Sequence, residues 1–294
     1  MHNKCAKIRH RFNKFYCEGA NTMEIKDKVA VITGAASGIG HAVCLELAAR
    51  GIKTIGMVDM SDEVKIAADN INEVTNTKCT IPFHGDTTDA EFRTHVFDTL
   101  CKENNVVNIC VPCAGITRDA LAIKIDKETG KSSIYPLEKF RLVVEVNLIA
   151  PIYWAMEMVA RIAEQRANRG LKKWHPDETI QGTVIFVGSI SSQGNKGQIS
   201  YASTKAGLEG AAATLTKEAI FHGVRCGVIH PGFTDTPMVR ALGDEYIEKN
   251  ILKDTQLGRL IRPTEIADAI CFMISNSAVS GELWADAGWH PSPA

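Results

Sequence analysis

Short apolar runs alternate with longer amphipathic stretches along most of the chain. Runs of four to eight apolar, often β-branched residues are typical of strands buried on both faces of a parallel sheet. Strands are predicted at Val29–Thr33, Thr54–Asp59, Cys79–His84, Val106–Val111, Thr183–Gly188, Val224–His230 and near Glu282–Ala285.

The amphipathic stretches between these runs predict helices. They cover Ile39–Arg50, Asp62–Glu73, Asp89–Glu103, Leu137–Arg169, Tyr201–Phe221, Asp244–Lys253 and Thr264–Ser275. Strands that are separated by helices of this length form right-handed βαβ units. The pattern therefore predicts an α/β fold with a doubly wound parallel sheet and helices on both faces. We expect one dinucleotide-binding catalytic domain over residues 23–294.

Two stretches interrupt the rhythm, Lys124–Tyr135 and Leu171–Gln181. Both are polar and contain Gly or Pro, so both are interpreted as loops. We expect both to leave strand ends at the carboxyl edge, where open α/β sheets bind ligands. They are candidates for shaping a substrate pocket or a subunit contact.

The first 22 residues differ from the rest, with five basic side chains against one acid and no apolar period. A basic, acid-poor start is typical of a mitochondrial transit peptide. Because serine is absent and the domain pattern begins after Met23, we favour a disordered extension or an over-long start. A cytoplasmic location is expected, with a mitochondrial one as the alternative.

The formal net charge of −1 provides no basic field for nucleic acid. No uninterrupted apolar stretch reaches about 18 residues, so no membrane span is predicted. The nine cysteines are scattered, which favours reduced thiols. Cys110 and Cys113 have C-x-x-C spacing, but they end a strand and lack two further metal ligands nearby. No redox or metal site is therefore expected.

A glycine-rich turn connects the first predicted strand to the first helix. It is Thr33-Gly34-Ala35-Ala36-Ser37-Gly38-Ile39-Gly40. Glycines in a strand–turn–helix frame let the backbone approach a pyrophosphate, whose charge then lies at the helix N-terminus. Asp59 ends the second strand about 20 residues on, where a carboxylate accepts hydrogen bonds from ribose hydroxyls and repels a 2′-phosphate. These features predict NAD; the alternative for Asp59 is a helix cap or a surface acid.

Tyr201 and Lys205 lie four residues apart on a predicted helix, so they share one face. A cation about 4 Å away, at an effective dielectric of ~20, contributes about 4 kcal/mol, or about three pKa units. We therefore expect Lys205 to lower the pKa of the phenol towards neutrality, where proton transfer is efficient. The spacing alone also fits a tyrosine on an amphipathic face. Because this spacing occurs together with the glycine turn and Asp59, we interpret Tyr201 and Lys205 as catalytic residues.

Over residues 24–288 the chain resembles the short-chain dehydrogenase/reductase family. The matching features occur in the family's order and are the glycine turn, Asp59, Asp86, Ala114-Gly115, Asn147, Ser189, Tyr201, Lys205 and Pro231-Gly232. The resemblance implies a seven-stranded Rossmann-type sheet and a homotetramer or homodimer. It also implies an NAD-dependent oxidoreductase that interconverts a secondary alcohol and a ketone.

The resemblance further assigns roles to individual residues. Tyr201 would exchange the proton, Ser189 would hydrogen-bond the substrate oxygen, and Lys205 would bind the nicotinamide ribose. Asn147 would bend its helix and hold a water in the proton relay. The implied cofactor-binding residues are Gly34, Ser37, Gly38, Ile39, Gly40, Asp59, Asp86, Thr87, Cys113, Gly115, Tyr201, Lys205, Pro231, Gly232, Thr234 and Thr236.

Two branches of the family are the most similar. Residues 113–119 and 194–198 resemble 3-oxoacyl-[acyl-carrier-protein] reductases, whereas the insert before Leu137, Cys113 and the loop 171–181 resemble type 2 3-hydroxyacyl-CoA dehydrogenases. Both branches act on 3-oxoacyl or 3-hydroxyacyl thioesters, which is the predicted substrate class. Hydroxysteroid or polyol dehydrogenase activity is the alternative. A non-catalytic NAD-sensing protein on the same fold is the alternative of another class.

The chain departs from the family pattern at three places. Pro112-Cys113 replaces Asn-Asn, and Ala287 stands where a second glycine is usual. The segment from Ser189 to Tyr201 is one residue short, which makes Ser191 a rival for the serine role. Five residues after the Pro-Gly turn could form an apolar substrate lid or pack on their own domain: Phe233, Met238, Leu242, Tyr246 and Ile247.

Overall fold

The computed structural model describes residues 23–289, so the basic segment 1–22 lies outside the described residues. Seven strands form one sheet in the order β3-β2-β1-β4-β7-β8-β9, and every neighbouring pair is parallel. This confirms the predicted fold class. The strands are β1 (Val29–Thr33), β2 (Thr54–Asp59), β3 (Thr80–His84), β4 (Ile109–Pro112), β7 (Gly182–Val187), β8 (Val224–Pro231) and β9 (Gly281–Ala285).

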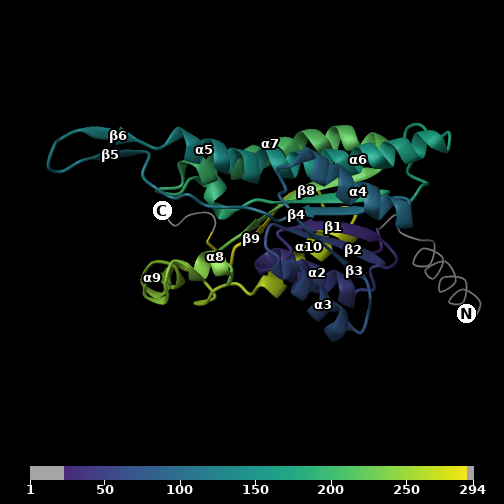
Figure 1. Ribbon diagram of the computed structural model, residues 1–294, viewed down its shortest axis with the longest axis horizontal. Helices are drawn as coiled ribbons and strands as arrows, with labels where there is room; N and C mark the ends of the chain where they lie inside the picture. Colours follow the sequence, from purple (N-terminus) through teal and green to yellow (C-terminus); the bar gives the residue numbers. More distant parts are fainter. Residues whose placement is uncertain (1–22, 290–294) are drawn as a thin grey trace, which may run out of the picture.

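Helices cover both faces of the sheet (Figure 1). The α-helices are α2 (Gly38–Ala49), α3 (Glu63–Thr75), α4 (Ala90–Asn104), α5 (Leu137–Val144), α6 (Ala150–Asn168), α7 (Ile199–Glu218), α8 (Pro237–Arg240), α9 (Asp244–Asn250) and α10 (Pro263–Ser275). Buried side chains of α2, α3 and α10 form one core with the sheet, and those of α4, α6 and α7 form a second core on the other face. The predicted strands and long helices agree with these bounds to within a few residues.

The strand order reverses between β1 and β4, which are neighbours at the centre of the sheet. Connections after these two strands leave towards opposite faces, so a crevice opens at their carboxyl ends. The segments that follow β1, β4, β7 and β8 all meet at this edge. The topology therefore places the glycine turn and the segments after the later strands side by side.

One long helical segment runs from Leu137 to Asn168 and is apolar enough, by length and composition, to cross a membrane. Within it, α6 packs on the sheet, and the side chains of Trp154, Met158 and Ile162 are completely buried in the core of that face. These contacts are those of a core helix in a layered α/β fold. Between α5 and α6 the segment contains a π-helical turn, Glu145–Ile149, which interrupts the helix predicted as continuous.

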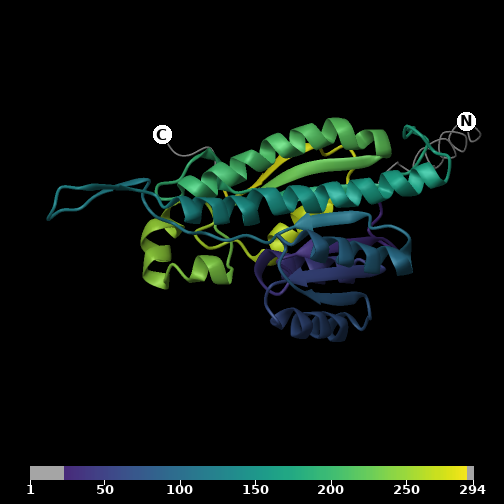
Figure 2. The ribbon, with the colours of Figure 1, turned by 45° about the horizontal axis from the view of Figure 1, so that its top comes forward.

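The stretch predicted as a loop at Lys124–Tyr135 is instead largely a β-hairpin. Strands β5 (Ile123–Ile125) and β6 (Ser132–Ile134) pair antiparallel, and the hairpin extends away from the body of the molecule (Figure 2). All side chains of the two strands are exposed. The polar composition indicated the exposure correctly, but cross-strand pairing was not visible in such a short alternation.

The second stretch, Leu171–Gln181, is a loop as predicted, but its predicted position was wrong. It follows α6 and leads into the amino end of β7, and its backbone bonds to the segment that enters β8: Trp174 N donates to Phe221 O and Gln181 N to Gly223 O. The loop therefore lies at the amino edge of the sheet, at the end of the molecule away from α8 and α9 (Figure 1).

Candidate active site

A cleft of about 610 Å³ lies along the carboxyl ends of the strands. Every residue that the sequence predicted for cofactor binding, from Gly34 to Thr236, lines it. Ser189, Tyr201 and Lys205 line the same cleft, whereas the loop 171–181 contributes nothing to it. Residues that lie far apart along the chain thus meet at one edge of the sheet.

The glycine turn after β1 has the geometry that a phosphate cradle requires. Gly34 and Gly38 adopt φ values of +65° and +58°, which only glycine enters without strain. A Cβ on Gly40 would lie 2.2 Å from Gly34 O, so the backbone there approaches itself too closely for a side chain. Helix α2 begins at Gly38 and has no acidic side chain in its first turn. Its N-terminal amide groups are therefore available to an anion.

Asp59, the last residue of β2, faces the same cleft. One carboxylate oxygen accepts from Ala36 N at 3.0 Å and the other accepts from Ser61 N at 2.9 Å. An ionised carboxylate has about four acceptor positions, so two remain for a ligand. Among the described residues that line the cleft, only Arg118 and Lys205 are basic, and both lie on segments that follow β4 or β7 rather than β2.

Ser189 and Tyr201 come together from two different elements. Ser189 follows β7 directly and Tyr201 lies in the first turn of α7, and the Ser189 hydroxyl lies close enough to the phenol to lower its pKa. The rival Ser191 points elsewhere, because its hydroxyl donates to Gln198 Oε1 at 2.8 Å. The structure therefore brings Ser189, and not Ser191, to the tyrosine.

Lys205 lies one helical turn after Tyr201, on the same face of α7. Its ammonium donates to Val187 O at 2.7 Å and lies 5.5 Å from the centroid of the Tyr201 ring. Burial lowers the pKa of Lys205 to about 8.

The predicted lowering of the Tyr201 pKa is not found. Burial raises the pKa of this phenol most strongly, the neighbouring Ser189 hydroxyl lowers it in part, and the charge of Asp119 raises it further. The prediction placed the cation about 4 Å away and neglected desolvation, which disfavours the charged phenolate.

Asn147 is completely buried in the π-helical turn between α5 and α6. Its Oδ1 accepts from Ile116 N at 2.9 Å, and its Nδ2 donates to Ile116 O at 2.8 Å. The side chain therefore ties the segment after β4 to the irregular helix, as a bend at this residue would require. Asn147 does not line the cleft itself.

The far end of the cleft contains a polar network that the sequence reasoning did not assign. Gln198 Nε2 donates to Asp119 Oδ2 at 2.8 Å, and Asn195 Nδ2 donates to Gln198 Oε1 at 3.0 Å. All three residues line the cleft. Asp119, Asn195 and Gln198 belong to the two segments that resemble one branch of the family. That local similarity was the available signal.

The five residues considered for an apolar lid divide into two groups. Phe233, Met238 and Leu242 line the cleft. Ile247 is buried in a small cluster with Ile251 and Leu260 and therefore packs on its own domain, and Tyr246 is exposed outside the lining. The apolar side chains that line this part of the cleft thus come from the segment around α8, and Ile247 of α9 packs beneath them.

Cys113 also lines the cleft, next to Lys205, but its chemistry is not that of a reactive thiol. Burial raises its pKa to about 12 and raises the pKa of Cys110 as well. Both cysteines are free. Protonated thiols are poor nucleophiles and poor metal ligands, so the C-x-x-C spacing reflects packing.

Comparison with known proteins identifies a family model and relatives that match most of this chain. A family model described as short chain dehydrogenase matches residues 28–247. The 3-oxoacyl-[acyl-carrier-protein] reductase FabG of Escherichia coli (strain K12) is 33% identical over 263 residues, which cover 88% of this chain and 96% of the relative. The enzyme of the same name from Thermotoga maritima is 30% identical over 269 residues and covers 89% and 96%.

Among solved structures, that of gox2181 superimposes with a TM-score of 0.75. The match covers 90% of this chain and 96% of gox2181 at 22% identity. At this identity the likeness concerns the fold alone.

Proposed function

Because this chain belongs to the short-chain dehydrogenase/reductase family, we propose that it is an NAD(H)-dependent oxidoreductase acting on 3-oxoacyl and 3-hydroxyacyl thioesters. The oxidoreductase class follows from the family. The thioester substrate is supported by the relatives named 3-oxoacyl-[acyl-carrier-protein] reductase, which the chain matches almost from end to end.

One observation carries the proposal. The Ser189–Tyr201 hydroxyl pair lies with the Lys205 ammonium in the cleft that also contains the glycine turn. A proton donor, a hydrogen-bond donor for an oxygen and a cation are the groups that carbonyl reduction requires. Because these groups lie beside the glycine turn, the cleft is better explained as an active site than as a polar pocket with no catalytic role.

The backbone around the glycine turn fits a dinucleotide. The positive φ values of Gly34 and Gly38 and the missing Cβ atom of Gly40 leave the N-terminus of α2 open to a pyrophosphate. The two remaining acceptor positions of Asp59 suit the hydroxyl groups of an adenosine ribose. When bound, the nicotinamide supplies or takes up the hydride at its C4 atom.

The chain's own residues provide the proton chemistry. Tyr201 donates its phenolic proton to the substrate oxygen in reduction and accepts it back in alcohol oxidation. Ser189 donates a hydrogen bond to the same oxygen. Lys205, whose ammonium lies 5.5 Å from the Tyr201 ring, would bind the nicotinamide ribose. The raised pKa of Tyr201 keeps the phenol protonated at neutral pH, which suits the reductive direction. Asn147 positions the segment after β4 through its two bonds to Ile116.

NAD preference is supported by the charge at the β2 end of the cleft. Asp59 would repel a 2′-phosphate, and no described lining residue at that end offers a basic side chain. The test is to measure the dissociation constants of NADH and NADPH. Asp59→Asn keeps an acceptor for Ala36 N but removes the charge, so the preference for NADH should fall at least about tenfold. Asp62→Asn, an exposed acid nearby, is the matched control and should change nothing.

The substrate class rests on the lid as well as on the relatives. Phe233, Met238 and Leu242 form an apolar wall near the catalytic groups, which suits an acyl chain more than a polyol. The decisive experiment is a screen of 3-oxoacyl thioesters, steroid ketones and sugars, with NADH consumption as the readout. Turnover of thioesters supports the proposal. Turnover of steroids or sugars alone replaces the substrate, and NADH binding without any turnover favours a binding protein.

We also propose a homodimer or homotetramer, which is supported by exposed apolar side chains on the π-turn and α6, including Ile149, Tyr153 and Met156. Mass measurement in solution tests it. A cytoplasmic location is supported by the seven free cysteines among the described residues.

Residues 23–294 are proposed to act as one catalytic domain.

A further inference from the structure

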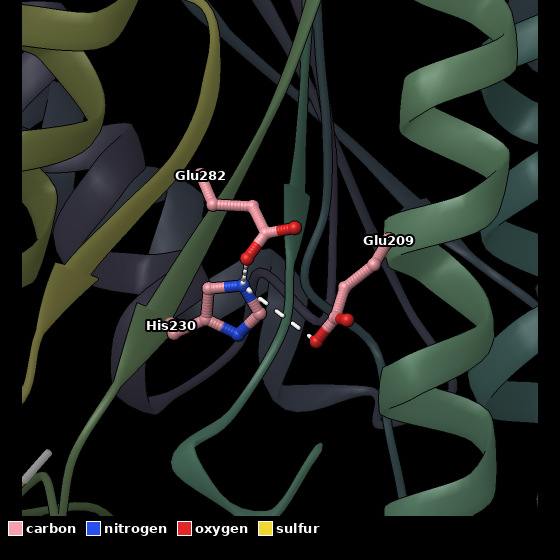
Figure 3. Close-up of side chains that lie close together, drawn as sticks. All are labelled: Glu209, His230 and Glu282. Atoms are coloured by element: carbon pink, nitrogen blue, oxygen red, sulfur yellow. Dashed lines mark ion pairs between the residues drawn. The ribbon is translucent and has the colours of Figure 1, made fainter. Parts of the chain in front are cut away.

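Next to the backbone of Ser189, between β8, β9 and α7, a buried imidazole faces two carboxylates (Figure 3). His230 belongs to β8 and has no exposed surface. Its Nε2 lies 3.3 Å from Glu282 Oε2 and 3.9 Å from Glu209 Oε1. Glu282 lies on β9 and Glu209 on α7, so three different elements build the cluster.

The orientation of the imidazole ring is fixed from both sides. The ring stacks on Trp284, with centroids 4.1 Å apart and planes inclined by 14°. A Cβ on Gly188 would lie 2.6 Å from His230 Nδ1, so the glycine leaves space for the ring. Nδ1 itself lies 3.3 Å from Ser189 O. Because a carbonyl oxygen only accepts hydrogen bonds, Nδ1 carries the ring proton.

This tautomer leaves Nε2 unprotonated beside two carboxylates, which is energetically unfavourable unless a cation lies between them. In the neutral ring with a proton on Nδ1, Nε2 has no proton, and its lone pair points at two carboxylate oxygens. Among the described residues, neither Nε2 nor Glu209 Oε1 has a hydrogen-bond partner. An unpaired buried acceptor costs free energy, and three acceptors facing one another also repel. A cation between the three atoms, either a proton or a metal ion, would remove both costs.

The distances favour the metal ion. A charge-assisted N–H···O bond is about 2.7–2.9 Å long, and both nitrogen–oxygen distances exceed that range. A zinc ion with bonds of about 2.0–2.2 Å separates its tetrahedral ligand atoms by about 3.3–3.6 Å. The 3.3 Å contact to Glu282 lies in this range, and the 3.9 Å contact to Glu209 exceeds it by about 0.3 Å, so Glu209 would move slightly inward on binding. The ligand atoms of the three residues all lie within 4.8 Å of one another. A metal-bound histidine typically donates its second N–H to a carbonyl or carboxylate, as the Nδ1 contact to Ser189 O does here.

We propose that Glu209, His230 and Glu282 bind a divalent transition-metal ion, with Zn²⁺ as the best match to one imidazole and two carboxylates. The side chains of Glu209 and Glu282 are 25% and 41% exposed, so the ion can enter from solvent and keep a water ligand. Bound there, it holds the His230 ring against the backbone of Ser189. The occupancy of this site is measured without any substrate, so its test does not depend on the proposed reaction.

The test uses the full chain after treatment with a chelator. Zn²⁺ is titrated by calorimetry into the unaltered protein, into Glu209→Gln and Glu282→Gln, and into the double variant. Each single variant should weaken binding at least about tenfold, and the double variant should lose one bound ion per chain. Asp62→Asn is the matched control, since Asp62 lies 3.2 Å from the exposed His84 without a second carboxylate. It should leave the stoichiometry unchanged.

Two further measurements keep the result unambiguous. Circular dichroism of each metal-free variant shows whether it is folded, and the two single variants provide separate tests of one site. Co²⁺ in place of Zn²⁺ should give the intense visible absorption of a tetrahedral ion, and this absorption should vanish in the double variant. Equal Zn²⁺ binding by the unaltered protein and the double variant would overturn the proposal and leave an imidazolium between two carboxylates.

Discussion

The two halves of the cleft are built from different material. Around Gly34–Gly40, the backbone itself makes the site, because a Cβ at Gly40 would collide with other backbone atoms. On the side of β7, α7 and α8, side chains make the site, and Ser189, Tyr201 and Phe233 arrive there from separate elements. A backbone site tolerates few substitutions and serves one ligand class. A side-chain site can change its substrate while the scaffold stays the same.

The largest expected effect is the loss of turnover in a variant that changes only the side-chain half of the cleft. Tyr201→Phe removes the proton donor and leaves the ring, so kcat for ketone reduction should fall about 10²- to 10⁴-fold. The glycine turn is untouched, so NADH affinity should change only slightly. Steady-state kinetics and fluorescence titration of NADH measure the two quantities. A variant that keeps the full rate would remove Tyr201 from the mechanism.

The second prediction addresses the backbone half. Gly40→Ala places a Cβ 2.2 Å from Gly34 O and 2.8 Å from Gly34 C, neither of which can move as a side chain does. The free energy of unfolding should fall by about 2–3 kcal/mol, and NADH affinity should fall with it. Denaturant titration and NADH binding are the measurements.

Gly210→Ala is the matched control for this substitution. Gly210 lies within α7, and nothing lies within 4 Å of the added Cβ. Alanine is favoured over glycine inside a helix, so this variant should gain up to about 1 kcal/mol. If Gly40→Ala were equally stable and bound NADH normally, the turn would not be a steric cradle.

A pH profile sharpens the description of the side-chain half. Folding lowers the pKa of Lys205 to about 8, so the ammonium is present below that pH and lost as the pH rises through it. For ketone reduction, kcat/KM should therefore be level near pH 7 and fall above about pH 8, by up to about tenfold per pH unit. A profile that stays level to pH 10 would show that the ammonium charge does not contribute.

The smallest expected effect concerns the strand end next to the Pro-Gly turn. Ala287 adopts φ +58°, a conformation that costs a residue with a Cβ about 1–2 kcal/mol. Ala287→Gly should raise the free energy of unfolding by about 0.5–1 kcal/mol, after the entropy of glycine is subtracted. The exposed helical Ala213→Gly should shift the denaturant midpoint in the opposite direction. Shifts of the same sign would mean that no strain is relieved at Ala287.

Patterns that depend on near neighbours were predicted well. Continuous apolar runs such as Val29–Thr33 indicated buried strands, because each residue of a parallel strand meets a covered face. The four-residue spacing of Tyr201 and Lys205 placed both on one face of α7, because a helix turns every 3.6 residues. The hairpin β5–β6 was missed because it is too short for its alternation to be recognised.

Patterns that depend on packing were not readable in advance. Ser189 and Ser191 are equivalent by spacing, and only the turn after β7 directs one to Tyr201 and the other to Gln198. Burial reversed the expected shift of the Tyr201 pKa, because desolvation is a property of the assembled core. Glu282, the last member of the cluster around His230, is distant along the chain and comes close only because β9 pairs with β8.

By itself, the sequence determined the strands, the helices that cover them, the glycine turn and the family to which the chain belongs. Each of these follows from residues within a few positions of one another, where backbone geometry and side-chain period dictate the outcome. Only the tertiary structure decided which serine faces the tyrosine, where the two irregular segments lie and which acids surround His230. Those contacts join distant segments, and their energies depend on burial and distance that exist only after the layers have packed.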